Sequence, residues 1–349
     1  MQIASFGSAP GVEALIYEAP PKGLYLKSLL DRVADWIAED IGRKQLRPRL
    51  VHGHKLTMEG IVAARVAARL GIPYALSLQG NTDRRILAAR PDLASLYRRI
   101  FHGASVVFPF SPWILAIAQA RLGHRSGPVV VLPCATTADR IMAPRIVDPT
   151  VVSVFHLAHH RLKNAQALIA ASTRIQRDVP NYRFEIIGNG SEAARRALDQ
   201  AIHRAGAASV YLPGPVPHDK IQPRMNASAG MALVSHRESF GMVFIEAVLA
   251  GCPIVYPAGI AVDGFFDGCP FAIAAPSRDA EAIEDGIRRL LREQEQLKRS
   301  LARWQEGPGP KIFQRESIAA AYTHGLSLAV EEGAEGPLAG KRSAEGRGG

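Results

Sequence analysis

The chain has 349 residues, of which 47% are hydrophobic and 21% are charged, and this length and composition suggest two globular domains. Lysine and arginine outnumber aspartate and glutamate by 42 to 32, and the net charge of +10 favours an anionic partner such as a nucleotide sugar or an acidic lipid surface. No apolar run is long enough to span a bilayer, the three scattered cysteines are too few for a disulfide framework or a zinc site, and no nucleic-acid-binding signature accompanies the charge.

Segments with the spacing of strands alternate with helical segments along the whole chain. In the first half, strands are expected at 3–6, 49–52, 74–78, 105–108 and 129–132, and helices at 25–41, 57–70, 93–101 and 114–122. A linker punctuated by Pro133, Pro144 and Pro149 follows. Beyond it, strands are expected at 151–157, 183–187, 210–212, 230–234 and 254–256, and helices at 165–177, 191–205, 242–250, 280–304 and 316–330.

This alternation predicts the α/β class, with two doubly wound domains that face each other across a cleft. We expect a first domain at 1–145, a second at 146–315, a C-terminal helix at 316–330 and a disordered tail at 331–349, which is rich in glycine, alanine, serine and charge. Ligands of such sheets bind at the carboxyl ends of the strands, which here means in the cleft between the domains. Because no signal peptide opens the chain, cytoplasmic residence is the simplest expectation.

The loop and helix that follow the strand 230–234 carry the strongest chemical signal. The amides of Ser239, Phe240 and Gly241 begin the helix, and free amides at a positive helix end suit a sugar diphosphate. Glu246 lies one or two turns into the helix, where a carboxylate suits ribose hydroxyls; its apolar neighbours argue against a solvated surface position. For Glu238 taken alone, the alternative is a charge at the start of the helix that the helix dipole favours.

Taken together, Glu238, the Ser-Phe-Gly that follows it, Glu246 and the Ala-Gly-x-Pro exit resemble the Glu-x7-Glu signature of retaining GT-B glycosyltransferases of family four, glycosyl transferases group 1. The resemblance runs from about residue 48 to 322. It implies the GT-B fold and transfer of a sugar, with retention, from a UDP- or GDP-type donor to a glycan or lipid-linked acceptor. It places Glu238 against the transferred sugar. Neither a metal nor another cofactor is implied, and no Asp-x-Asp motif is present.

The resemblance also assigns positions in the rest of the donor half. Lys163 matches a lysine that faces the donor phosphates, just before the helix expected at 165. The arginine that accompanies it in the family falls on His156 or, if the loop is shifted, on Arg161. Gly188 belongs to a Gly-Asn-Gly turn that matches a family turn near the donor, although such a turn alone is weak evidence.

Four strand-end residues of the first domain are expected at the cleft: Gln79 is predicted to be catalytic together with Glu238 and Lys163, and His52, His54 and Asn81 are predicted to lie on the acceptor side. His52 and His54 close a strand, so both side chains are expected to project toward the cleft, with a solvated turn as the equal alternative for His52. Gln79 stands where many relatives carry a histidine close to the transferred sugar; it can bond a sugar hydroxyl but cannot act as a base. Asn81 ends the same strand.

The start of the chain departs from the family. A strand, a Gly-Gly loop and a helix normally precede the segment that resembles 3–6, and Gly7 and Gly11 do not reproduce that loop. Either a further segment precedes Met1 or the first unit is absent, and a truncated, catalytically silent nucleotide-sugar-binding protein is therefore the alternative function.

The first half also carries two clusters of basic residues, and the family commonly serves cell-envelope polysaccharide or lipid-linked oligosaccharide synthesis. Peripheral attachment to the inner face of the membrane is thus weighed against a simply solvated basic face. The clustered residues are Arg43, Lys44, Arg47 and Arg49, and then Arg84, Arg85, Arg90, Arg98 and Arg99.

Overall fold

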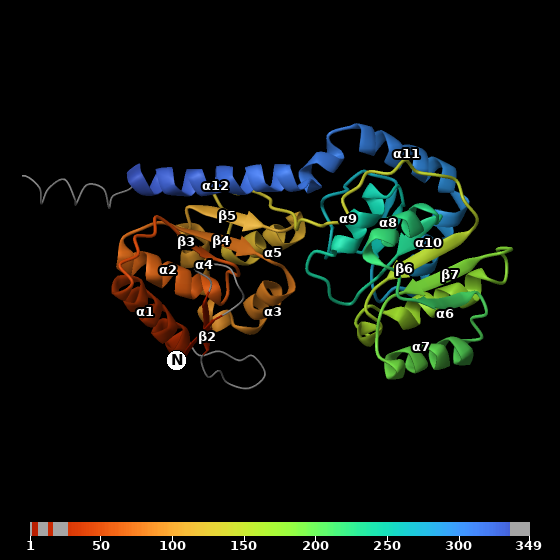
Figure 1. Ribbon diagram of the computed structural model, residues 1–349, viewed down its shortest axis with the longest axis horizontal. Coiled ribbons are helices and arrows are strands. Elements are labelled where there is room, and N and C mark those ends of the chain that lie inside the picture. The colour runs from red at the N-terminus through yellow and green to blue at the C-terminus, as the bar shows by residue number, and fades with distance from the viewer. Residues whose placement is uncertain (1, 6–12, 17–26, 336–349) are drawn as a thin grey trace, which may run out of the picture.

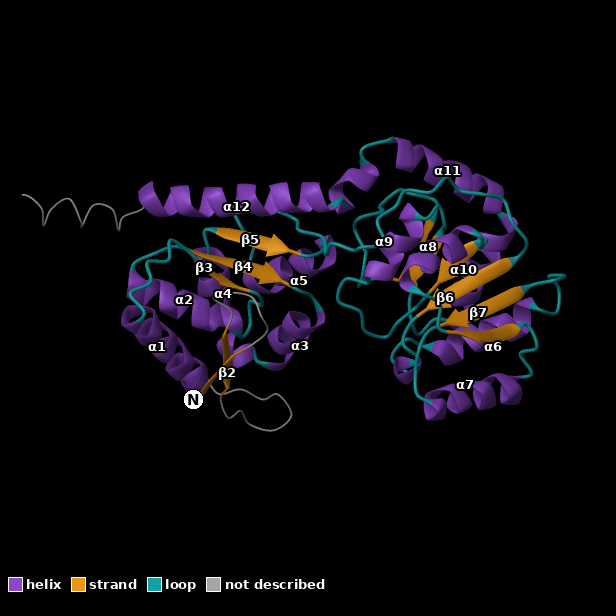
Figure 2. Ribbon diagram, viewed as in Figure 1, coloured by secondary structure: helices purple, strands orange, loops and turns teal. Residues whose placement is uncertain are grey.

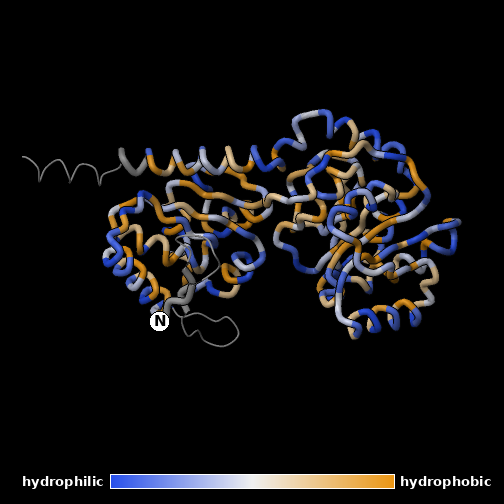
Figure 3. Tube along the Cα trace, viewed as in Figure 1, coloured by the Kyte–Doolittle hydropathy of each residue, from blue (hydrophilic) through white to orange (hydrophobic). Residues whose placement is uncertain are grey.

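The computed structural model describes residues 2–5, 13–16 and 27–335, which form two α/β lobes and one long helix that runs from the second lobe back over the first (Figure 1). Hydrophobic segments lie mainly inside the lobes, whereas the outer helices show a hydrophilic side (Figure 3). Within the part of the chain that is described, no helix is both long and apolar enough to cross a membrane.

The first domain is built on a parallel sheet in the order β3-β4-β5. Its strands are β3 (Val51–Gly53), β4 (Tyr74–Leu78) and β5 (Val106–Pro109). Its helices are α1 (Lys27–Arg43), α2 (Glu59–Leu70), α3 (Asn81–Ala89), α4 (Ala94–Gly103) and α5 (Pro112–Leu122). The strands β1 (Gln2–Ser5) and β2 (Glu13–Ile16) pair with each other in antiparallel fashion. Helical crossovers connect these strands, which therefore run parallel. The carboxyl ends of β4 and β5 point toward the second domain (Figure 2).

The second domain has a six-stranded sheet, parallel throughout, in the order β11-β10-β9-β6-β7-β8. Its strands are β6 (Thr150–Val154), β7 (Arg183–Ile187), β8 (Val210–Gly214), β9 (Gly230–Ala232), β10 (Ile254–Pro257) and β11 (Ala272–Ala275). Its helices are α6 (Ala165–Ile175), α7 (Glu192–Ala205), α8 (His218–Asn226), α9 (Met242–Leu249), α10 (Ala280–Arg292) and α11 (Gln294–Glu306). The strand order reverses between β6 and β9, and the carboxyl ends at this switch point form the ligand crevice of doubly wound sheets.

The predicted alternation of strands and helices is confirmed, and the differences are local. The stretch 129–132 runs beside β5 but forms no full strand: it has one bridge, between Val107 and Val129, and the amides of Val130 and Leu132 donate to the carbonyls of Val107 and Pro109 at 3.0 and 2.8 Å. The segment expected as one helix at 280–304 turns at Glu293, so that Leu290 of α10 and Leu297 of α11 are both fully buried in one core. The elements β2, α3, α8 and β11 were not predicted, because their short apolar runs lack a clear period.

The helix α12 (Arg315–Glu335) joins the two domains, because it leaves the second and packs on the first (Figure 1). Tyr322, Leu326 and Ala329 pack against Phe108 of β5. Gly325 lies so close to this sheet that a Cβ atom there would sit 2.4 Å from Cε1 of Phe108. The helix continues to Glu335, five residues beyond its expected end at 330, and the rest of the predicted tail lies outside the described residues.

Candidate active site

Glu238 and Lys163, two of the three residues predicted to be catalytic, are in direct contact at the switch point of the second sheet. Lys163 follows β6 and Glu238 follows β9, two strands that are neighbours in the sheet although their residues are 75 positions apart. The Lys163 Nζ donates to Glu238 Oε2 at 2.5 Å, and the side chains are 18% and 16% exposed. The structure thus places a cation and a carboxylate together at the carboxyl edge of the sheet, still reachable from solvent.

Asn164 connects the loop after β6, which carries Lys163, to the loop after β9, which carries Glu238. It is buried, adopts a left-handed backbone with φ of 58°, and precedes α6 directly. Its Nδ2 donates to the carbonyl oxygens of Val234 at 3.2 Å and of Ser277 at 2.7 Å. The amide of His236 adds a bond to the carbonyl of Leu162 at 2.9 Å. Sequence reasoning missed Asn164, although asparagine at a loop-to-helix boundary is a residue type that tolerates this backbone conformation.

The start of α9 offers backbone amides next to Glu238. Gly241 has a φ of 77°, and a Cβ atom there would lie 2.7 Å from the Phe244 ring and 3.1 Å from Cγ of Glu238. Gly241 is also the N-cap residue, and no side chain caps the helix. The amide of Ser239 donates to Glu238 Oε1 at 3.3 Å, and the Phe240 ring is buried edge-on against Phe265. Phe240 can therefore serve a ligand only through its backbone.

Glu246 is half-buried in the second turn of α9, and one of its oxygens is already engaged. Its Oε1 accepts a bond of 2.6 Å from Thr136 Oγ1, which lies in the linker between the domains. The sequence did not predict Thr136, because a threonine in a loop carries no signal of its own.

The glycines after β7 are explained first by packing. A Cβ atom at Gly188 would lie 1.8 Å from the carbonyl oxygen of Phe155, and one at Gly190 would lie 2.7 Å from Cβ of Leu157. Glycine is thus needed for the loop after β7 to pass over the loop after β6. His156 is exposed in the loop after β6, and its Nδ1 accepts a hydrogen bond from the amide of Ala158 at 3.3 Å. Arg161, in the same loop, is also exposed.

Across the domain boundary, the loop after β4 lies against the loop before α9. Gly80 has a φ of 127°, and a Cβ atom there would lie 3.0 Å from the Trp113 ring and 3.1 Å from Cα of Ser239. Gln79 and Asn81, which flank Gly80, are therefore brought close to the Glu238 loop. Asn81 Oδ1 is buried and lacks a hydrogen-bond partner within the described part of the chain. A second contact joins the domains nearby, where Trp113 Nε1 donates to the carbonyl of Ala261 at 2.9 Å.

Asp83 holds the loop after β4 in place, and sequence reasoning missed it. Its side chain is fully buried and Oδ1 accepts from the amide and the hydroxyl of Thr57, at 3.0 and 2.8 Å. Its Oδ2 accepts from the amide of Gln79 at 3.3 Å. Burial raises the pKa of this carboxyl to about 6, and the three donated bonds oppose part of that rise.

The two histidines that were expected at the cleft differ in their placement. His52 lies under α12, where Nδ1 is 2.9 Å from the Tyr322 hydroxyl and Nε2 is 2.9 Å from Ser77 Oγ. Alternate residues of a strand point to opposite faces, and His52 takes the face that α12 covers. Burial, with the neighbouring His54, lowers the pKa of His52 to about 4. Both ring nitrogens are engaged, so His52 does not project toward the cleft as expected, whereas His54 is exposed.

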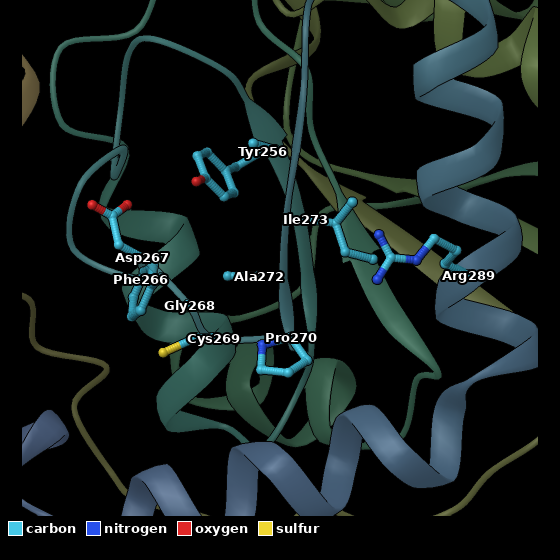
Figure 4. Close-up of a pocket in the computed structure, with 10 residues that line it drawn as sticks. Tyr256, Phe266, Asp267, Gly268, Cys269, Pro270, Ala272, Ile273 and Arg289 are labelled. Atoms are coloured by element: carbon cyan, nitrogen blue, oxygen red, sulfur yellow. The ribbon is translucent and has the colours of Figure 1, made fainter.

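A separate pocket of about 470 Å³ lies at the edge strand β11 and is lined by none of the predicted site residues. Tyr256 and Asp267 line one side and Arg289 of α10 approaches from the other (Figure 4). Among the residues that the structure describes, no group of three or more His, Cys, Asp or Glu side chains could hold a metal ion.

Comparison with protein families agrees with this two-domain arrangement. Residues 143–304 match the family model described as glycosyl transferases group 1, and residues 7–135 match the glycosyl transferase 4-like domain. The two matched stretches follow each other along the chain as the two domains of the structure do. It is also 25% identical to the 2-deoxystreptamine glucosyltransferase of Streptomyces kanamyceticus over 259 residues, which cover 66% of this chain. The matched region is 65% of that relative, less than two thirds of its length.

Solved structures show the same fold. Sucrose-phosphate synthase from Thermosynechococcus elongatus superimposes with a TM-score of 0.66 at 18% identity, covering 92% of this chain and 84% of the synthase. HepE of Anabaena, solved in complex with UDP and glucose, gives a TM-score of 0.61 at 17% identity, covering 86% of this chain and 81% of its own. The chain therefore has the GT-B fold, as the resemblance implied.

Proposed function

We propose that this protein transfers a sugar from a nucleoside diphosphate donor of the UDP or GDP type to a hydroxyl of a glycan or lipid-linked acceptor, with retention at the anomeric carbon. The observation that carries the proposal is the contact of Lys163 with Glu238 at the switch point, beside the uncapped start of α9. A cation and free amides suit a diphosphate, and the adjacent carboxylate suits sugar hydroxyls.

The donor would lie along the loops after β6 and β9. Lys163 would leave Glu238 to face the diphosphate, where negative charge develops as the sugar–phosphate bond breaks. Glu238 would then accept bonds from the transferred sugar, and the amides of Phe240 and Gly241 would face the donor. Glu246 would accept from the ribose. His156, Arg161 and the Gly188 turn lie in the loops around the same strand ends, and we assign them to the donor side.

The acceptor would enter from the first domain, past Gln79 and Asn81, with exposed His54 farther along β3. Gln79 can bond a sugar hydroxyl but cannot remove its proton. In a retaining transfer the acceptor oxygen bonds to the anomeric carbon on the face that the leaving group vacates. The acceptor proton then passes to the departing phosphate oxygen, so the site needs no separate base.

Two measurements test the proposal. First, titration with UDP and GDP should show binding that Glu246→Ala weakens by about 1–3 kcal/mol, the scale of a lost bond to a charged group. Second, UDP- or GDP-hexoses with mixed glycan and lipid-linked acceptors should release the nucleotide and yield a product with the donor's anomeric configuration.

The two measurements also separate the alternative function. Nucleotide binding without turnover on any acceptor favours a catalytically silent nucleotide-sugar-binding protein. If neither UDP nor GDP binds, both functions fail. We further propose polysaccharide or cell-envelope synthesis as the setting, on the cytoplasmic side and with peripheral contact to the membrane. The basic residues of the first domain motivate that contact.

A further inference from the structure

We infer that Thr136 is a positioning residue of the donor site, which holds Glu246 with one carboxylate oxygen occupied and the other open to the ribose of the nucleotide. The inference deepens the proposed function and rests on it. Thr136 lies outside the Glu238–Glu246 block, in the linker that connects the two domains, so it acts on the nucleotide only through Glu246.

The direction of the bond from Thr136 is fixed by its neighbour. Thr136 is 5% exposed, and its Oγ1 accepts a bond of 3.1 Å from the amide of Ala138. A hydroxyl has one proton to donate, and with the amide on its acceptor side this proton points at Glu246 Oε1, 2.6 Å away. The short distance fits a donor facing an ionised carboxylate. Oε1 is therefore held, and Oε2 remains available to ribose hydroxyls, which need an acceptor.

The linker that carries Thr136 is held to the second domain by hydrogen bonds. Among the described residues, the last backbone hydrogen bond from this stretch to the first domain runs from the amide of Leu132 to the carbonyl of Pro109, at 2.8 Å. Farther along, the amide of Met142 donates to the carbonyl of Leu249 at the end of α9, at 2.8 Å. Five side chains of the second domain donate to linker carbonyls: Gln222 to Arg140, Asn226 to Ala143, Gln294 to Val147, Lys298 to Arg145 and Gln305 to Met142.

These bonds fix the position of Thr136 relative to α9, and none of them involves the first domain. Lys298 and Asn226 are nearly fully buried, so their bonds to the linker are sheltered from water. The geometry of Glu246 is thus set before a nucleotide arrives, which reduces the loss of side-chain freedom on binding. Without the Thr136 hydroxyl, Glu246 would have to be ordered by the ligand itself.

The test compares Thr136→Val, Thr136→Ser and Thr137→Val with the wild-type chain by isothermal titration. Valine keeps the shape of threonine but lacks the hydroxyl, serine keeps the hydroxyl, and Thr137 is the exposed neighbour that serves as the matched control. UDP and GDP are titrated first, and inorganic pyrophosphate then probes the phosphate subsite alone. We expect Thr136→Val to weaken nucleotide binding roughly tenfold and to leave pyrophosphate affinity unchanged, with Thr136→Ser and Thr137→Val close to wild type.

A double variant makes the test specific to Glu246. If Thr136 acts through Glu246, adding Thr136→Val to Glu246→Ala weakens nucleotide binding no further. Wild-type affinity in Thr136→Val, or an equal loss for nucleotide and pyrophosphate that serine does not restore, overturns the inference and leaves the proposed function standing. Absence of nucleotide binding to the wild-type chain overturns both.

Discussion

Glu238 has two possible roles: it is either a charge at the start of α9 or a residue that binds the transferred sugar. These two roles predict very different effects of mutation on turnover. Its side chain already has Lys163 as a partner, so a diphosphate that draws Lys163 away would free Oε2 of Glu238 for the sugar. We expect Glu238→Gln to lower turnover by at least about a hundredfold while nucleoside diphosphate affinity changes little, since electrostatic contacts made in the transition state are worth several kcal/mol. Turnover at the wild-type level would leave Glu238 as a helix-end charge only.

Asp83 gives the loop after β4 a pH dependence whose sign follows from its pKa. The pKa is raised from the ordinary 3.8 to about 6, so the folded chain holds this proton more tightly than the unfolded chain does. The stability from this group is fully present below about pH 4 and is lost as the pH rises through about 6. Relative to Asp83→Asn, the wild-type chain should therefore lose up to about 3 kcal/mol of unfolding free energy between pH 4 and 7.

The measurement is urea unfolding of the wild-type protein and of Asp83→Asn across this pH range. The control variant is Asp92→Asn. Asp92 is an exposed aspartate whose pKa is lowered by its hydrogen bond to Arg90. Its contribution has the opposite sign, since it is lost as the pH falls. A wild-type chain that gains stability over Asp83→Asn as the pH rises would contradict the assignment.

At the scale of elements, the close packing of α12 on β5 depends on glycine at position 325. A Cβ atom at Gly325 would lie 2.4 and 2.6 Å from two carbons of the Phe108 ring, which is fully buried. Gly325→Ala should therefore lower stability by about 1–3 kcal/mol, even though alanine favours helices over glycine by about 1 kcal/mol.

Gly42 of α1 provides the same substitution without the obstacle, because nothing lies within 4 Å of a Cβ atom placed there. Gly42→Ala should leave the melting temperature unchanged or raise it. Thermal unfolding of the two variants side by side is the measurement. If both variants shift in the same direction, the tight contact between α12 and β5 is not what fixes glycine at 325.

At the scale of the whole molecule, the basic charge of the first domain predicts weak binding to anionic lipid. The structure narrows the candidates, because Arg43 and Lys44 pair with Asp40 and Arg90 pairs with Asp92. The exposed arginines that remain in the two clusters are Arg47, Arg49, Arg85, Arg98 and Arg99. Each basic group near such a surface contributes about 1 kcal/mol at most, and salt screens it.

Co-sedimentation with anionic vesicles at low and high salt tests this binding. Replacing Arg98 and Arg99 by glutamine should reduce the bound fraction at low salt. Replacing Arg292 and Arg299, exposed arginines of the second domain, should not. Equal losses in the two variants would assign the binding to net charge and not to the arginines of the first domain. Binding that salt leaves unchanged would assign it to apolar contact.

The alternation of strands and helices, the two-domain GT-B fold and the Glu238–Glu246 block follow from the sequence itself. Each depends on signals that are local: apolar periodicity, glycine and proline at the turns, and a motif within one loop and one helix. The same locality explains the misses. Nothing within 280–304 marks the turn at Glu293, since the change of direction serves a core that both helices share.

Only the tertiary structure decided which of these residues meet. Lys163 contacts Glu238 because β6 and β9 are neighbours at the point where the strand order reverses. Thr136 contacts Glu246 because the linker is hydrogen-bonded to several helices of the second domain. His52 faces α12 and not the cleft because a helix from the far end of the chain covers that side of the sheet. Such contacts join residues many positions apart, and they are set by strand order and domain packing, which no short stretch of sequence encodes.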